Sequence, residues 1–125
     1  MEKMEERALR LHKEALVVDT HCDTLLCLFP GRGSPPITPL RVESGLGGRS
    51  DKGHLDIPRM VEGGVDCQVF AVFAAQEPHP PRPLNVALQL IDVFYSECEK
   101  NADRIVPVCS HDEIMAANRD GKIAA

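Results

Sequence analysis

Apolar residues along this chain follow two patterns, one typical of buried strands and one typical of helices. Residues 15–18 and 65–73 are apolar runs rich in β-branched side chains, which predicts strands covered on both faces of a parallel sheet. Residues 105–108 also look extended, although Pro107 assigns them to an edge or irregular strand. Residues 122–125 begin what looks like another buried strand. The pattern therefore predicts two good strands, one edge strand and one that is just starting.

Helical patterns separate these strands. Apolar residues recur at helical spacing over residues 2–14 and again over a longer helix at 84–101. Two further short helices are marked by their end signals: Asp56 as N-cap with Gly63 and Gly64 as stop, and an S-x-x-E capping box at Ser110 and Glu113 with Gly121 as stop. Alternating strands and helices predict a parallel α/β architecture.

The segment 30–53 carries many Gly and Pro residues and predicts a long loop within a single domain spanning residues 1–125. Its Gly45-Leu46-Gly47-Gly48 sequence is not a phosphate-binding loop, because no G-K-[ST] follows and no strand precedes it. The strands are too few to close a (β/α)8 barrel, which takes about 250 residues.

Composition and charge narrow the function classes. With 43% hydrophobic and 26% charged residues, the chain has the composition of a soluble globular protein, so we expect no membrane partner. A net charge of −5 without a basic block argues against a nucleic-acid partner. The five Cys residues form no C-x-x-C pair, and the N-terminus lacks the apolar run of a secretory signal. We therefore expect a cytoplasmic location.

A polar cluster follows the first predicted strand, where parallel α/β proteins place their ligands. It contains Asp19, His21 and Asp23. Two residues apart on extended backbone, His21 and Asp23 point to the same face and can share a metal ion. Both are normal zinc ligands, but two ligands leave a tetrahedral ion half bound. The alternative is that all three residues cap or hydrogen-bond the loop; His54 is expected to be a structural hydrogen-bonding residue.

Two motifs carry a family resemblance. The sequence from Val17 to Leu25, with its H-x-D, and the sequence from Gly53 to Phe70, with D-I-P-R-x-x-E-G-G-V, together resemble the opening of the membrane (renal) dipeptidase family of zinc peptidases. The resemblance implies the N-terminal part of a TIM-like (β/α)8 metallohydrolase barrel. It also implies two Zn²⁺ ions, bridged by a glutamate and a water, that hydrolyse dipeptides. In that pattern His21 and Asp23 would bind the first zinc, and Asp19 would form hydrogen bonds near these ligands.

The same resemblance places the bridging glutamate, both histidines of the second zinc and the acidic residue for proton transfer beyond Ala125. No catalytic residue is therefore assigned. The chain is expected to be an N-terminal fragment that is inactive alone, with a dipeptide as substrate of the complete enzyme. One alternative is a truncated, non-catalytic remnant that associates with a complementary chain, or with itself, through exposed strands. The other is a different metal-dependent amidohydrolase, although that group usually carries H-x-H where this chain has Asp23.

Overall fold

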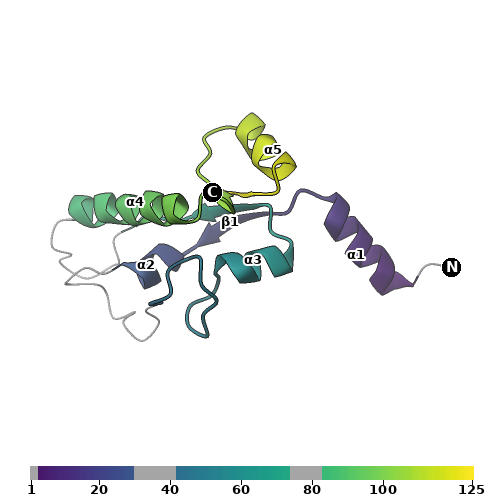
Figure 1. Cartoon of the computed structure of the whole chain (residues 1–125), viewed down its shortest axis with the longest axis horizontal. Coiled ribbons are helices and arrows are strands. Elements are labelled where there is room, and N and C mark those ends of the chain that lie inside the picture. The colour runs from purple at the N-terminus through teal and green to yellow at the C-terminus, as the bar shows by residue number, and fades with distance from the viewer. Residues whose placement is uncertain (1–2, 30–41, 74–82) are drawn as a thin grey trace.

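The computed structural model describes residues 3–29, 42–73 and 83–125 (Figure 1). The first half of the predicted loop over 30–53 lies outside these ranges. In chain order the described elements are α1 (Met4–Glu14), β1 (Val18–Cys22), α2 (Thr24–Leu28), α3 (Ile57–Gly63), β2 (Cys67–Phe70), α4 (Pro83–Lys100), β3 (Ile105–Val106), α5 (His111–Arg119) and β4 (Ile123–Ala124).

The strands form one parallel sheet in the order β1-β2-β4-β3, so the predicted parallel α/β architecture is confirmed. The register pairs Val18 with Cys67 and Cys67 in turn with Ala124. β3 lies at the edge beside β4, as the sequence predicted from Pro107.

The predicted limits of the first strand were wrong. We expected a buried strand over residues 15–18, whereas β1 begins at Val18 and continues through the polar residues to Cys22. Leu16 and Val18 are 38% and 43% exposed. β1 is an edge strand among the described elements, and α1 does not cover it, so the apolar run has no second layer to pack against. The second strand is also shorter than the predicted 65–73.

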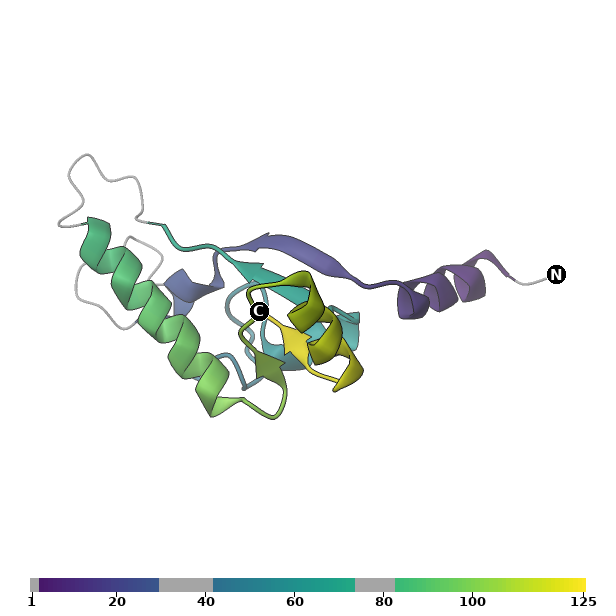
Figure 2. The ribbon, with the colours of Figure 1, turned by 90° about the horizontal axis from the view of Figure 1, so that it is seen from above.

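Helices cover both faces of the sheet. Neighbouring strand residues divide between two clusters: Ile105 and Ile123 pack with Ile57 of α3 and Cys98 of α4, whereas Val106 and Ala124 pack with Ala117 of α5. Because successive side chains of a strand point to opposite faces, α3 and α4 cover one face and α5 covers the other. Figure 2 shows the same arrangement from above.

Helix α2, which the sequence pattern did not predict, packs against α4. Its residues Leu25 and Leu26, with Phe29 just beyond it, surround Leu90 of α4. The longer helix agrees with the predicted 84–101, and Leu90 and Cys98 are among its buried residues. Val93, Phe94 and Cys98 pack into the core, whereas Leu84 and Leu88 are 69% and 56% exposed. Only part of the apolar surface of α4 is therefore buried.

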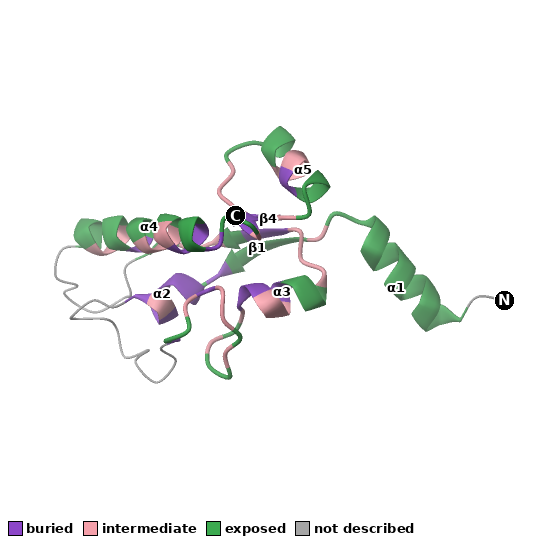
Figure 3. Cartoon of the chain, viewed as in Figure 1, coloured by how far each residue is buried: buried purple, intermediate pink, exposed green. Residues whose placement is uncertain are grey.

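The first helix agrees with the predicted 2–14 but buries none of its residues. It extends away from the sheet in both ribbon views, and Figure 3 shows it exposed along its whole length. His12 connects it to α3: the Nε2 atom of His12 lies 2.8 Å from the carbonyl oxygen of Gly63 at the end of α3. Its apolar residues Met4 and Leu11 are 89% and 49% exposed.

The predicted helix caps are largely confirmed. The Asp56 carboxylate accepts a hydrogen bond of 2.8 Å from the backbone N–H of Arg59, and Gly64 ends α3 with φ at 66°. At α5, Ser110 Oγ accepts from the backbone N–H of Glu113 at 3.3 Å. The Glu113 carboxylate accepts from the backbone of Cys109 at 2.6 Å, one residue earlier than in a standard capping box.

None of the helices within the described ranges is long and apolar enough to cross a bilayer.

Candidate metal centre

His21 and Asp23 meet where β1 passes into α2. His21 is the penultimate residue of β1, and Asp23 occupies the N-cap position of α2 with φ −96° and ψ 14°. The Nε2 atom of His21 lies 2.9 Å from Oδ1 of Asp23. The prediction that the two side chains face the same side is therefore confirmed. The alternation of side chains along extended backbone explains this only in part, because Asp23 lies beyond the end of β1.

Asp19, which lies in β1, stabilises the backbone of this turn through a hydrogen bond. Its Oδ1 atom accepts a hydrogen bond of 3.0 Å from the backbone N–H of His21. The pairing of β1 with β2 is irregular over the same stretch, between Asp19 and Cys22. A local irregularity of this kind re-aims side chains at the end of a strand, and here it accompanies the turn of His21 toward Asp23.

These residues line a cavity of about 420 Å³ at the C-terminal end of β1. Its wall includes His54 and Leu55 from the segment that leads into α3, and Cys27 from α2. Sequence reasoning treated His54 as a structural residue and did not place it beside the cluster. Only its position two residues before the Asp56 N-cap could have suggested this, because α3 packs against the same sheet.

The His21 imidazole and the Asp23 carboxylate in this cavity are exposed to solvent, whereas its two thiols are buried. The side chains of His21 and Asp23 are 68% and 55% exposed. Burial raises the pKa of the Cys22 thiol, hydrogen bonding from Thr24 partly opposes this, and the carboxylates of Asp19 and Asp23 raise it further. Burial and Asp23 likewise raise the pKa of Cys27. Since a thiol binds metal as the thiolate, these raised pKa values make Cys22 and Cys27 poor metal donors.

The His21–Asp23 pair has the chemistry and nearly the spacing of two zinc ligands. Zinc holds nitrogen and oxygen ligands at about 2.0–2.2 Å in a tetrahedron, which separates adjacent ligands by about 3.3–3.5 Å. The observed 2.9 Å would need to open by a few tenths of an ångström, which two exposed side chains allow. No group of three or more potential metal ligands exists within the described ranges. The chain thus offers a pair of donors, about half of a tetrahedral set.

A parallel α/β sheet that presents a His–Asp pair at the C-terminal end of its first strand has the layout typical of α/β metallohydrolases. Residues 5–125 match the membrane dipeptidase family (peptidase family M19), which is generally a family of metallopeptidases. The chain belongs to this family, and the resemblance seen in the sequence is confirmed.

A solved structure shares the fold. The probable dipeptidase PvdM from Pseudomonas aeruginosa is similar with a TM-score of 0.71 at 14% sequence identity, over 95% of this chain and 29% of that chain. The match is consistent with part of a barrel, and this chain spans less than a third of the length of PvdM. A search of curated proteins found no match.

Proposed function

We propose that this chain supplies the first two zinc ligands of a dipeptidase, with His21 and Asp23 as the donors. The observation that supports this most directly is the 2.9 Å approach of His21 Nε2 to Asp23 Oδ1 at the C-terminal end of β1. Membership of the membrane dipeptidase family supports hydrolysis of a dipeptide bond as the reaction of the complete enzyme. Zinc, when bound, lowers the pKa of a coordinated water to about 7 and polarises the peptide carbonyl.

Within this site, neighbouring residues of the chain hold the two proposed ligands in position. Asp19 fixes the backbone of His21 through the 3.0 Å hydrogen bond, which limits the directions that the imidazole can take. Asp23 is held at the start of α2, whose next residues are buried against α4. The ligands therefore project from a packed strand–helix junction.

The site is proposed to be completed by groups beyond the described residues. His21 and Asp23 leave further coordination positions open, and the chain spans 29% of the related PvdM structure. We accordingly assign the complete dipeptidase activity to a larger assembly of which this chain provides the first strands. A non-catalytic remnant is the second candidate, favoured by the exposed Val18 of the edge strand β1 and the exposed Leu16 just before it.

Metal binding tests the proposal directly. Zn²⁺ is titrated into the ¹⁵N-labelled chain while the imidazole ¹⁵N and ¹H resonances of each histidine are followed. We expect the His21 ring resonances to shift saturably, with a weak affinity that reflects two ligands, and the Asp23→Asn variant to lose the shift.

The matched control is His111, which is also exposed and also contacts a neighbouring carboxylate, with Nδ1 3.3 Å from Asp112 Oδ1. The His111→Ala variant should bind zinc as the parent chain does. If His21→Ala leaves zinc binding unchanged, or if His111→Ala removes it, His21 and Asp23 are not the zinc ligands.

A further inference from the structure

His54 lies at the wall of the cavity that holds the candidate metal ligands, and the fold does not use its imidazole. The sequence led us to expect a structural hydrogen-bonding residue here. Among the described residues, however, the His54 ring has no hydrogen-bond or ion-pair partner, and the residue is exposed. The neighbouring Leu55 is half-buried and packs against the core cluster that contains Ile57. Leu55 therefore anchors the backbone, whereas the His54 imidazole remains available to a ligand.

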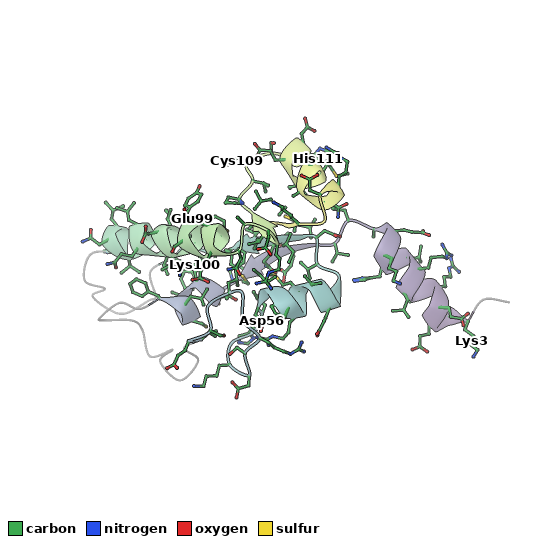
Figure 4. All side chains as sticks on the ribbon, viewed as in Figure 1. Lys3, Asp56, Glu99, Lys100, Cys109 and His111 are labelled. Carbon is green, nitrogen blue, oxygen red and sulfur yellow. The ribbon has the colours of Figure 1, made fainter. Side chains whose placement is uncertain are left out.

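The backbone just before His54 is held by the first turn of α3. The Arg59 guanidinium donates from Nε to the buried Asp56 carboxylate at 2.8 Å (Figure 4). Its two terminal nitrogens face the carbonyl oxygens of Lys52 and Gly53, each at 3.5 Å. Gly53 also takes φ +71°, a conformation that favours glycine, so the chain turns immediately before His54. The position of His54 is thus set by contacts of its neighbours and not by a contact of its own ring.

The side-chain donors that line this cavity within the described ranges are two imidazoles and two buried thiols, and thiols are weak donors. The His21 ring lies 2.9 Å from Asp23 and is proposed above to bind the metal. Ionised carboxylates, such as those of Asp19 and Asp23, only accept hydrogen bonds. Within the described lining, the His54 imidazole is therefore the side chain best able to donate a hydrogen bond to an oxygen atom of a ligand.

From these observations we infer that His54 is a substrate-binding residue that donates a hydrogen bond to an oxygen atom of the dipeptide. The inference rests on the proposed function, because its substrate is the one on which the His21–Asp23 site would act. A dipeptide offers two acceptors of this kind, the carbonyl oxygen of its peptide bond and its C-terminal carboxylate. Arg59 acts here as a positioning residue, since it holds the backbone that leads into His54.

The test follows the ¹⁵N and ¹H ring resonances of His54 in the whole chain, in excess Zn²⁺, while the dipeptide Gly-Leu is titrated in. We expect the His54 resonances to shift saturably. Glycyl-leucinamide, in which an amide replaces the carboxylate, distinguishes the two acceptors. A shift with both probes identifies the peptide carbonyl as the acceptor, and a shift with Gly-Leu alone identifies the carboxylate.

Three variants at exposed histidines separate hydrogen bonding from packing. His54→Leu removes the donor and should weaken Gly-Leu binding by about threefold to tenfold, the equivalent of one hydrogen bond. His54→Gln retains an N–H donor and should recover most of the affinity. His111→Leu makes the first change at a histidine outside the cavity lining and should leave the affinity within about twofold. Circular dichroism verifies that all three variants remain folded, and their zinc affinity should stay within about twofold.

The inference and the proposed function fail in different ways. If zinc shifts the His21 ring resonances but neither dipeptide probe shifts those of His54, the inference is overturned and the metal site stands. Equal weakening by His54→Leu and His54→Gln, or by His54→Leu and His111→Leu, would likewise show that His54 does not donate to the substrate. If zinc leaves the His21 ring resonances unchanged, the proposed function fails, and the inference fails with it.

Discussion

The carboxylate of Glu97 on α4 accepts a hydrogen bond of 2.7 Å from the backbone N–H of Leu46, 51 residues earlier in the chain. The Leu46 carbonyl in turn accepts from the N–H of Ile57 at 2.9 Å, the first residue of α3. Gly45, with φ +66°, permits this approach, because a Cβ atom there would lie 2.8 Å from Glu97 Oε2. This contact fixes the segment that carries His54 to the wall of the candidate metal centre.

Replacing Glu97 by Ala should destabilise the fold by about 2–3 kcal/mol, because a buried backbone donor loses a charged acceptor. Glu97→Gln, which retains an acceptor oxygen, should cost less. Urea unfolding followed by circular dichroism gives both values. Lys100→Ala is the control: its Nζ lies 2.7 Å from Glu97, but its side chain is 64% exposed, so the change should be below about 1 kcal/mol. An equal effect of Glu97→Ala and Lys100→Ala would contradict the assigned role.

Asp56, at the start of α3 (Figure 4), should make the stability of the fold depend on pH below about 5. Burial pushes the pKa of this carboxyl up, but hydrogen bonds from the backbone of Ser50 and Arg59 and from the Arg59 guanidinium outweigh burial and lower it overall. A lowered folded-state pKa contributes stability above the unfolded value of about 3.9, and this contribution is lost as the pH falls through the folded-state pKa.

The Asp56→Asn variant isolates this effect, since asparagine still caps a helix but carries no charge. We expect the variant to be about 1–3 kcal/mol less stable than the parent at pH 7, with the difference shrinking between about pH 5 and pH 2. Urea unfolding at a series of pH values measures it. A difference that stays constant over this range would show that the charge of Asp56 does not contribute.

The five thiols should differ sharply in reactivity. Cys109 is exposed, whereas Cys22, Cys27, Cys67 and Cys98 are buried. Burial, assisted by the Glu97 carboxylate, raises the pKa of Cys98 to about 11. At pH 8 a thiol-specific reagent should therefore modify Cys109 rapidly and Cys98 very slowly. Mass spectrometry after timed labelling locates the modified residues; rapid labelling of Cys98 in the folded chain would show that α4 does not pack as described.

The chain by itself, supplied with zinc, should show no measurable hydrolysis of a dipeptide such as Gly-Leu. His21 and Asp23 are a pair of donors, and each missing ligand removes both affinity for the ion and control over the bound water. Release of free amine is assayed with the His21→Ala variant alongside. Turnover that requires zinc and disappears in this variant would show that the chain carries a complete site.

Short-range patterns in the sequence predicted many elements of the fold correctly. The caps of α3 and α5, the extent of α4 and the edge position of the strand before Pro107 follow from interactions within a few residues, so the sequence itself specifies them. The H-x-D spacing likewise placed His21 and Asp23 side by side, because the residues are neighbours in the chain. The family could be identified for the same reason: its motifs are short and contiguous.

Tertiary packing decided the rest. The apolar run over 15–18 predicted a buried strand, yet it lies exposed at a sheet edge, because burial depends on which layer covers a segment. For the same reason, α1 buries none of its residues and Leu88 of α4 is exposed. His54 lies at the wall of the candidate metal centre because of contacts between residues far apart in sequence, among them the Leu46–Glu97 hydrogen bond. Periodicity describes which face of an element is apolar, but only the packed fold determines what lies against that face.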